Sequence, residues 1–313
     1  MSPLVTVIVP GRDVERYAPA ALASLQAQTE RRWRAILVDD GSVDATGAIF
    51  AAAARSDPRF VLVRHDQPRG LSAARNTALD LVDTPYLGFL DGDDELAPTA
   101  LTRLTASLAE TGSDFAVAAY VRTRAGADGV YRPGRVQPWV SASTSPPRQR
   151  TTIREHPHAS GNIVAWSKVS RAKFWDGIRF PLGVAYEDQI IAQQMYTRAE
   201  AFDVLPDVAV HWRLRAEGTS ITQAKDRLPT LRDYLSALRG GIDVLLAAGA
   251  SDAVVARLDL ILAMDVPPLA RIAANHPDPA YAATLTTFLS DLRALPEYAR
   301  TSPDPTLADA LTW

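Results

Sequence analysis

Short apolar runs alternate with segments of helical spacing along the first part of the chain. Five runs are rich in β-branched or aromatic residues and bounded by turn residues, which predicts buried strands at 4–9, 35–38, 60–63, 86–90 and 115–121. Between them, four segments rich in alanine and leucine predict helices at 20–28, 43–54, 71–82 and 98–110. This alternation predicts an α/β fold in which a mostly parallel sheet has helices on both faces.

The pattern changes after residue 122. Residues 122–150 are rich in Gly, Pro, Ser and Arg, and predict a long loop or irregular insertion. Mixed short elements follow up to residue 222, including a helix at 186–199 and a strand at 208–215. Three further helices are predicted at 228–250, 251–266 and 281–295. We expect them to form a bundle packed on the preceding part or an oligomerisation element.

Composition narrows the class of protein. The chain has 313 residues, 47% of them hydrophobic, which is enough for one large or two modest cores. A net charge of −3 argues against a nucleic-acid partner, and the absence of cysteine excludes disulfides and thiolate chemistry. No apolar run approaches the roughly 20 residues that span a bilayer. We expect a cytoplasmic protein and leave peripheral membrane contact open.

Charged loops follow three of the predicted strands. They are PGRD (10–13), DDGS (39–42) and DGDD (91–94). Ligands of such sheets bind beyond the carboxyl ends of the strands, so these loops are candidates for one site. Asp39 and Asp40 could accept hydrogen bonds from a nucleotide base or a ribose hydroxyl. Ser42 or Asp44 could instead only cap the next helix.

The DGDD loop carries the strongest chemical signal. In an extended segment, Asp91 and Asp93 would point the same way. Two carboxylates suit Mg²⁺ or Mn²⁺, which take waters and substrate phosphates as further ligands. Carboxylates this close repel, so one of them should take up a proton unless a cation lies between them. The alternative is a solvated turn before the next helix.

Other nucleotide and phosphate folds fit less well. The first loop reads PGRDVE, whereas a dinucleotide-binding fold has G-x-G-x-x-G there. No G-x-x-x-x-G-K-[ST] string exists, which argues against a P-loop protein. A phosphatase of the haloacid dehalogenase type carries its DxD after the first strand, whereas here the string follows the fourth predicted strand.

Several motifs in register carry a family resemblance. VTVIVP, LQAQT, ILVDDGSVDAT, GLSAARNTALD and YLGFLDGDDEL occur in this order between residues 5 and 96. Together they resemble the family-2 inverting glycosyltransferases with the GT-A fold. The resemblance is close over 4–122 and looser through EGTSIT (217–222), and the tail from 225 lies outside it. It implies a nucleotide-sugar half at 1–122, an acceptor and catalytic-base half at 123–222, and a helical region at 223–313.

The resemblance also implies roles for single residues on the nucleotide side. Pro10 and Asp39 would line the base pocket, and Arg75 would border the nucleotide diphosphate. Asp91 and Asp93 would form the DxD motif, with Asp93 as the direct metal ligand. The family usually has P-x-Y-N where this chain has PGRD, so the choice of nucleotide stays open.

On the acceptor side, Glu187 and Asp188 match the family's ED motif, in which the aspartate is the catalytic base. Some GT-A enzymes complete their metal site with a late histidine, so His211 is a candidate ligand, with packing or acceptor contact as alternatives. Arg213 and Arg215 could both face the diphosphate or lie on an exposed strand face. The six arginines between 122 and 150 are either solvated or in contact with an anionic acceptor.

From these residues we predict a glycosyltransferase that uses Mn²⁺ or Mg²⁺ and a nucleoside-diphosphate sugar. If Asp39 accepts a hydrogen bond from the imide N–H of the nucleotide base, UDP or dTDP is the favoured nucleotide. The acceptor would be a hydroxyl of a glycan, a glycolipid or a small molecule, and homo-oligomerisation through the C-terminal helices stays open. Two alternatives remain: a degenerate scaffold that binds nucleotide or glycan without turnover, and a metal-dependent nucleotidyltransferase.

Overall fold

A ten-stranded sheet forms the centre of the molecule. The computed structural model describes residues 2–215 and 225–304. The strand order is β3-β2-β1-β4-β9-β6-β10-β5, with β7 pairing β6 and β8 pairing β10. The strands are β1 (Val5–Gly11), β2 (Trp33–Asp39), β3 (Phe60–Arg64), β4 (Tyr86–Phe89), β5 (Glu95–Leu96), β6 (Phe115–Ala125), β7 (Tyr131–Pro133), β8 (Arg148–Thr151), β9 (Lys168–Arg171) and β10 (Phe202–Arg213).

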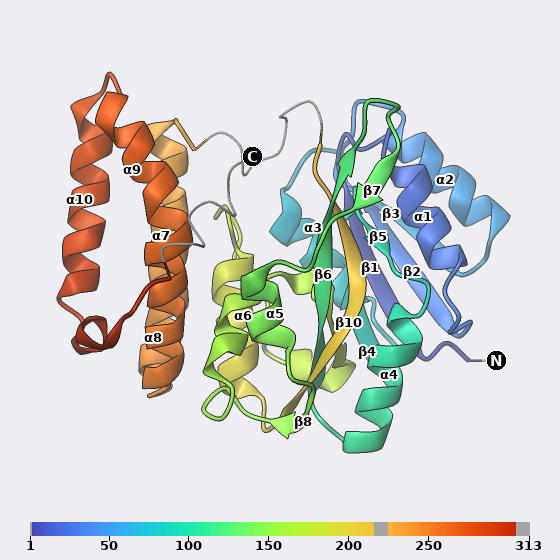
Figure 1. Cartoon of the computed structure of the whole chain (residues 1–313). Helices are drawn as coiled ribbons and strands as arrows, with labels where there is room; N and C mark the ends of the chain where they lie inside the picture. Colours follow the sequence, from blue (N-terminus) through green and yellow to red (C-terminus); the bar gives the residue numbers. More distant parts are fainter. Residues whose placement is uncertain (1, 216–224, 305–313) are drawn as a thin grey trace.

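The direction of the strands brings the charged loops to one edge. Strands β1, β2, β3 and β4 pair in parallel, and β6 pairs in parallel with β10. Strand β9 is antiparallel to both β4 and β6, so these two strands run the same way. The carboxyl ends of β1, β2, β4, β6 and β10 therefore meet along one side of the sheet, at the top in Figure 1. We call this side the loop edge.

Helices cover both faces of the sheet. In Figure 1, α1 and α2 lie on one side of the sheet, and α5 and α6 lie on the other. This arrangement confirms the predicted α/β fold. The helices are α1 (Ala18–Gln26), α2 (Thr46–Ser56), α3 (Leu71–Leu79), α4 (Ala100–Thr111), α5 (Pro138–Thr144), α6 (Asp188–Arg198), α7 (Leu228–Ala247), α8 (Ser251–Leu260), α9 (Val266–Asn275) and α10 (Pro279–Arg293).

The core explains why the apolar runs became strands. All seven residues of β1 and all four of β4 are buried, as expected for strands that are covered on both faces. Phe50 of α2 and Leu25 of α1 are fully buried on one face of this sheet. The buried core thus determines where each strand ends. The ends of the strands in turn determine where the loops lie along the loop edge.

The prediction of one long irregular loop over 122–150 is wrong. Strand β6 continues to Ala125 and forms a hairpin with β7, and α5 and β8 follow. The hairpin is short and carries polar residues, so it lacks the apolar alternation that marks a half-buried strand. The EGTSIT motif (217–222) lies outside the described residues.

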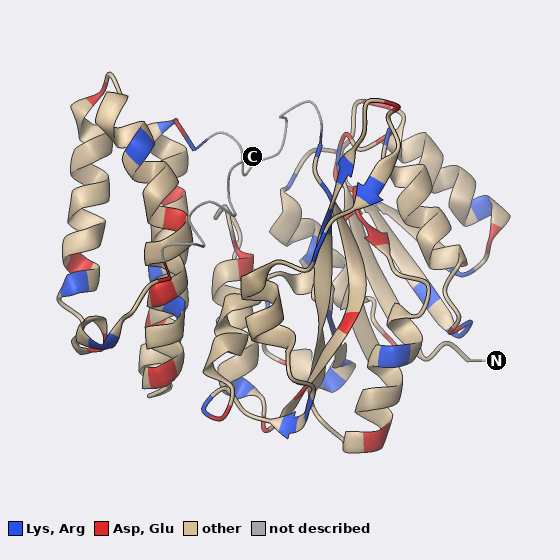
Figure 2. Cartoon of the chain, in the orientation of Figure 1, with Lys and Arg blue, Asp and Glu red and all other residues tan. Residues whose placement is uncertain are grey.

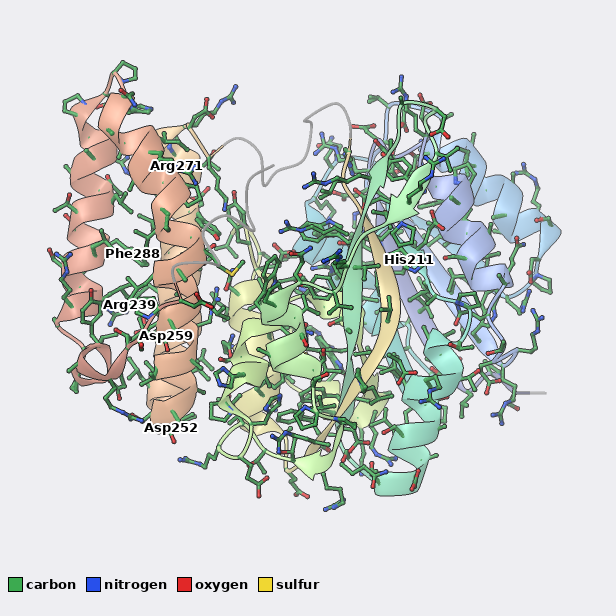
Figure 3. The ribbon with its side chains drawn as sticks, in the orientation of Figure 1. His211, Arg239, Asp252, Asp259, Arg271 and Phe288 are labelled. Carbon is green, nitrogen blue, oxygen red and sulfur yellow. The ribbon has the colours of Figure 1, made fainter. Side chains whose placement is uncertain are left out.

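The C-terminal helices pack against α6. The chain from Ser251 to Asn275 is a single helical run in which a π-helical turn (Ile261–Asp265) joins α8 to α9. Residues 225–304 therefore hold four α-helices, whereas we predicted three. These helices form the left part of the molecule in Figure 1, and Figure 3 shows their polar side chains, among them Arg239 and Asp259. Over the described ranges, no helix is both long and apolar enough to cross a bilayer.

Candidate active site

The first two charged loops are joined by hydrogen bonds. The Asp40 amide donates to the Gly11 carbonyl at 3.0 Å. Asp13 accepts from the Val43 amide at 2.9 Å, and its own amide donates to Ser42 Oγ at 3.2 Å. Asp13 takes a left-handed conformation with φ of 51°, which asparagine and aspartate tolerate better than most residues. The PGRD loop is thus built onto the DDGS loop, although it departs from the family pattern.

Asp39 is fully buried at the end of β2. Its Oδ1 accepts from the Ser42 amide at 3.0 Å. Arg64 Nε lies 3.1 Å from Oδ2 in an ion pair, and this oxygen accepts no hydrogen bond from the described residues. Buried polar atoms are rarely left without a partner. Arg64 supplies a positive charge beside Oδ2, and this is the Asp39 oxygen without a hydrogen-bond donor among the described residues.

Asp40 differs from its neighbour because its oxygens are occupied within the protein. Its Oδ1 lies 2.7 Å from His65 Nδ1 and accepts from the Arg69 amide at 2.8 Å. Its Oδ2 accepts from the Gly70 amide, also at 2.8 Å. These contacts hold the turn that precedes α3. We placed Asp40 with the nucleotide-binding residues, and the structure gives it a supporting place behind Asp39 instead.

The DGDD loop is a tight turn rather than the extended segment we predicted. The Asp94 amide donates back to the Asp91 carbonyl at 2.9 Å. The Gly92 amide donates to the Pro10 carbonyl at 3.1 Å, and a Cβ on Gly92 would lie only 3.0 Å from that oxygen. Pro10 therefore contributes through its backbone, which holds the DGDD turn against the first loop.

Arg75 of α3 links the DGDD loop to the ED motif. Its Nη2 donates to Asp91 Oδ1 at 2.9 Å. Its Nη1 donates to Glu187 Oε1 at 2.9 Å and to Asp188 Oδ1 at 2.7 Å. The Arg75 side chain is 1% exposed. Although burial alone would lower the pKa of Arg75, the three carboxylates raise it, so the guanidinium stays charged.

Arg215 and Arg213 follow β10 into the same region but differ in role. Arg215 holds Asp93 Oδ2 with Nε and Nη2, both at 2.7 Å. Arg213 is buried, and its guanidinium donates to the carbonyls of Asp93 at 2.5 Å and Tyr17 at 2.9 Å. Arg215 thus faces the candidate metal ligand, whereas Arg213 braces the backbone of the loop.

The repulsion between the DGDD carboxylates is relieved in two ways. Arg75 and Arg215 supply cations for Asp91 and Asp93. Asp94 is 2% exposed, and burial together with Asp93 and Asp91 raises its pKa well above the ordinary range. Burial and the two neighbouring aspartates thus favour the protonated form of Asp94. Burial also raises the pKa of Asp93, although Arg215 opposes the shift.

Asp91 and Asp93 are the residues that could hold a metal ion, together with ligands from a substrate. Arginine occupies Oδ1 of Asp91 and Oδ2 of Asp93, and both side chains are about a quarter exposed. In residues 2–215 and 225–304, no three His, Asp or Glu side chains gather closely enough to hold a metal. His211 lies on β10 opposite Glu95 (Figure 3), so it does not form a preformed three-ligand cluster with the two aspartates.

Glu187 and Asp188 stand at the start of α6. The amide of Ala165, in a 3₁₀ turn (Ala165–Ser167), donates to Asp188 Oδ2 at 3.3 Å. Asp188 occupies the first turn of α6, where the helix dipole favours a negative charge. Burial nevertheless raises the pKa of Asp188, and burial together with Asp188 raises the pKa of Glu187 to about 7.

Three features of the acceptor side were not found in the sequence. Tyr186 precedes the ED motif with φ of 60°, a strained value for a tyrosine. Lys168 is 2% exposed and donates to the Val164 carbonyl at 2.7 Å, and burial lowers its pKa to about 7. Trp166 lies on the same turn as Ala165. A buried lysine or a strained tyrosine has no sequence signal of its own.

The fold and the paired acidic loops define a protein of the GT-A class. The model of the family described as "Glycosyl transferase family 2" matches residues 6–176, more than half of the chain. The chain therefore belongs to glycosyltransferase family 2. This result confirms the family and the fold that the motifs predicted.

Known relatives agree with this assignment. Glycosyltransferase GlyA of Streptococcus pneumoniae serotype 4 is 28% identical over 241 residues, which cover 74% of this chain and 34% of GlyA. The chain spans about a third of the length of the first curated relatives it matches.

Two solved structures share the fold at low sequence identity. The structure of S. aureus TarS 1-349 in complex with UDP-GlcNAc has a TM-score of 0.74 and 19% identity, and covers 92% of this chain and 80% of that chain. A mannosyltransferase from Pyrobaculum calidifontis in complex with GDP-Man and Mn²⁺ has a TM-score of 0.55 and 18% identity, with coverage of 99% and 85%. At these identities the likeness concerns the fold.

Proposed function

We propose that this protein is a metal-dependent inverting glycosyltransferase of the hexosyltransferase type. It would move a sugar from a nucleoside-diphosphate sugar to a hydroxyl acceptor. The observation that carries the proposal is the position of Arg75, which contacts Asp91 on one side and Glu187 and Asp188 on the other. Asp91, at the candidate site of the leaving group, and Asp188, the candidate base, therefore both contact the guanidinium of Arg75.

The arrangement fits a single displacement. The acceptor oxygen forms a bond to the anomeric carbon while the bond from that carbon to the diphosphate oxygen breaks. Its electron pair leaves with the nucleoside diphosphate, and the acceptor proton passes to Asp188 Oδ. Arg75 holds Asp188 through Nη1 and Asp91 through Nη2. Glu187, which shares Nη1 of Arg75, orients the aspartate.

Asp91 and Asp93 are the residues that would hold Mn²⁺ or Mg²⁺. When bound, such a metal acts as a Lewis acid that neutralises the charge of a leaving diphosphate. The mannosyltransferase of the same fold, solved with GDP-Man and Mn²⁺, supports this proposal. Arg215 would approach the same phosphates; its contact with Asp93 at 2.7 Å supports this role.

The identity of the nucleotide is inferred from the side chain of Asp39. Its buried Oδ2 can accept from the imide N–H of uracil or thymine, and UDP or dTDP are therefore the favoured carriers. TarS in complex with UDP-GlcNAc supports uridine. Guanine also carries a ring N–H, so GDP is the competing nucleotide. A cytoplasmic location, peripheral membrane contact and homo-oligomers stay predictions.

A donor screen tests the proposal. The protein is mixed with UDP-, dTDP- and GDP-sugars, with Mn²⁺ or with EDTA, and thermal stability and released products are measured. A ligand present at about 100 times its Kd adds about 2.7 kcal/mol of stability. We expect a metal-dependent shift and release of the nucleoside diphosphate when an acceptor is present. Binding without release would indicate a scaffold, and release of pyrophosphate from nucleoside triphosphates would indicate a nucleotidyltransferase.

A further inference from the structure

Lys168 is a buried cation that the proposed transfer does not use. It is the first residue of β9, and its side chain is 2% exposed. Its Nζ donates to the Asn162 carbonyl at 2.8 Å, to Asn162 Oδ1 at 3.2 Å and to the Val164 carbonyl at 2.7 Å. Three acceptors match the three N–H donors of an ammonium group, whereas a neutral amine has only two. The geometry therefore fits the charged form of Lys168.

All three acceptors of Lys168 are uncharged. The ring of Tyr196 also faces the ammonium, with its centre 5.5 Å from Nζ. Burial lowers the pKa of Lys168 to about 7, and the charge of Asp188 opposes this shift. A buried cation is costly unless it is paired, and a neutral donor would hold the same carbonyls at a lower cost. The charge of Lys168 therefore indicates a role beyond packing, directed at Asp188.

The peptide unit between Val164 and Ala165 connects Lys168 with Asp188. Its carbonyl accepts from Lys168 Nζ at 2.7 Å, and its N–H donates to Asp188 Oδ2 at 3.3 Å. A trans peptide unit is planar, and its carbonyl and its N–H point in opposite directions. Lys168 and Asp188 therefore lie at the two ends of one peptide unit. A cation at the carbonyl makes the N–H a stronger donor, because hydrogen bonds in a chain polarise one another.

Lys168 also holds the turn that carries the Ala165 amide. It donates to Asn162 and Val164, which lie three residues and one residue before Ala165. At 3.3 Å, the bond from this amide to Asp188 is longer than the usual N–H···O distance of about 2.9–3.0 Å. A small shift of the turn would therefore break it.

Other charged groups around Asp188 act from different sides. Glu187, the neighbouring carboxyl, shares Nη1 of Arg75 with Asp188. Figure 2 shows the acidic colour at the first turn of α6. Burial raises the pKa of Asp188, and the charge of Asp91 adds to this shift. Arg75 and Lys168 lower the pKa of Asp188. Because a general base must be ionised to accept a proton, the charge of Lys168 favours the active form.

We propose that Lys168 is a positioning residue for the candidate base, and that it orients Asp188 and favours its ionised form through the peptide unit between Val164 and Ala165. This inference rests on the proposed function and adds a residue to the acceptor side. Lys168 is buried and acts through a peptide unit, so its loss should slow transfer and leave donor binding intact.

The first experiment compares kcat and the donor KM of wild type and Lys168→Met at pH 6 and pH 8. Methionine keeps an unbranched chain and removes the cation. At pH 6 we expect kcat to fall about tenfold, within the range of coupling between neighbouring residues, with the donor KM unchanged. The loss should be smaller at pH 8, where Asp188 ionises more readily without help. An unchanged kcat, or the same loss at both pH values, overturns the proposal.

Two further variants control for structural damage. Lys173→Met is the matched control, since Lys173 is an exposed lysine in the 3₁₀ turn (Ala172–Trp175) that follows β9. It should keep the wild-type kcat, and an equal loss in this control overturns the proposal. Lys168→Gln keeps an N–H donor without the charge, and is the second variant should thermal melting show that Lys168→Met does not fold. A wild-type kcat in Lys168→Gln at pH 6 also overturns the proposal.

A double-mutant cycle tests the coupling without any transfer assay. Melting temperatures are measured at pH 6 for Lys168→Met, for Asp188→Asn and for the double variant. If Lys168 acts on the charge of Asp188, Lys168→Met should lower the melting temperature by about 1–2 °C less in the Asp188→Asn background than in wild type. Additive changes in melting temperature overturn the proposal.

These readouts separate the two proposals. Non-additive melting temperatures without turnover of any donor would support the link between Lys168 and Asp188 and contradict the proposed transfer. Transfer at the wild-type kcat by Lys168→Met would support the proposed transfer and contradict the role of Lys168.

Discussion

The two sides of the candidate site are supported differently. On the donor side, Asp39, Asp91 and Asp93 lie at strand ends, and nearby loops hold them in place. On the base side, Glu187 and Asp188 start α6, which is backed by helices far along the chain. A Cβ on Gly241 of α7 would lie 2.9 Å from the Gln189 carbonyl, so α7 packs directly against the first turn of α6.

Side chains of the C-terminal helices complete the support of the base side. Arg257 of α8 is buried and donates to Gln189 Oε1 at 2.8 Å. The rings of Tyr234, on α7, and Tyr186 have centres 4.7 Å apart and planes tilted by 59°, and the Tyr234 hydroxyl donates to Asp265 at 2.5 Å. The donor side is therefore stabilised locally, whereas the base side depends on the region outside the family resemblance. Changes in the two regions should have separable effects.

The largest effect is expected at the base. Asp188→Asn keeps the shape and removes the proton acceptor, so transfer should fall about 10²–10⁴-fold with little change in donor affinity. Glu187→Gln is the matched control and should cost less. Donor titration and a transfer assay measure both. If Asp188→Asn transfers sugar at nearly the wild-type rate, another residue is the catalytic base.

On the donor side, Asp93→Asn should remove metal-dependent nucleotide binding. Metal charge stabilisation amounts to several kcal/mol, so the loss should reach at least about 100-fold. Calorimetry with UDP, with and without Mn²⁺, gives the value. Asp207→Asn, far from the site on an exposed ion pair, serves as control. An unchanged response to Mn²⁺ would rule out Asp93 as a ligand.

Asp39→Ala should weaken uridine or thymidine nucleotides by about 1.5–3 kcal/mol, as for a lost hydrogen bond to a charged group. Cytidine and adenosine nucleotides, which lack the imide, should be affected less. Direct binding titrations over the four nucleotides test this difference. Identical affinities in variant and wild type would show that Asp39 does not contact the base of the nucleotide.

The transfer rate and the stability of the protein should depend on pH through Glu187. The pKa of Glu187 is raised from 4.5 to about 7 by burial and by Asp188, so Glu187 takes up a proton below about pH 7 and its ion pair with Arg75 weakens. Because protonated Glu187 has the same charge as the side chain in Glu187→Gln, kcat should fall as pH drops below 7 and level off near the rate of that variant. Because the folded state binds this proton more tightly, its stabilising contribution is complete below pH 4.5 and is lost as pH rises through about 7. Rate and melting profiles over pH 4–9 should thus move in opposite directions, and a flat rate profile contradicts the assignment.

The smallest effect should come from the distant support. Arg257→Met removes the contact with Gln189 and should lower kcat a few-fold, with KM for the donor unchanged, because it acts only by positioning α6. Arg257→Lys should restore part of the rate. Arg239→Met, an exposed arginine of α7 paired with Asp243, is the control. Equal changes in kcat and in donor affinity would mean a general loss of structure.

Much of the donor side could be predicted from the sequence. The three acidic loops follow apolar runs, and a buried parallel sheet must place the ends of such runs along one edge. Even there, side-chain roles needed the structure. Asp39 and Asp40 are adjacent in sequence, yet Asp40 accepts from the Arg69 and Gly70 amides, whereas Asp39 Oδ2 lies 3.1 Å from Arg64 Nε.

The sequence by itself determined the α/β fold through the local periodicity of its apolar residues. It also determined the family, through the resemblance of several motifs in register, and that resemblance located the ED motif. Tertiary structure alone decided that Arg75 joins Asp91 to Asp188. It also decided that the C-terminal helices support α6. Such contacts join residues far apart in the chain, and their distances follow from the packing of the sheet and helices, which no local pattern of residues records.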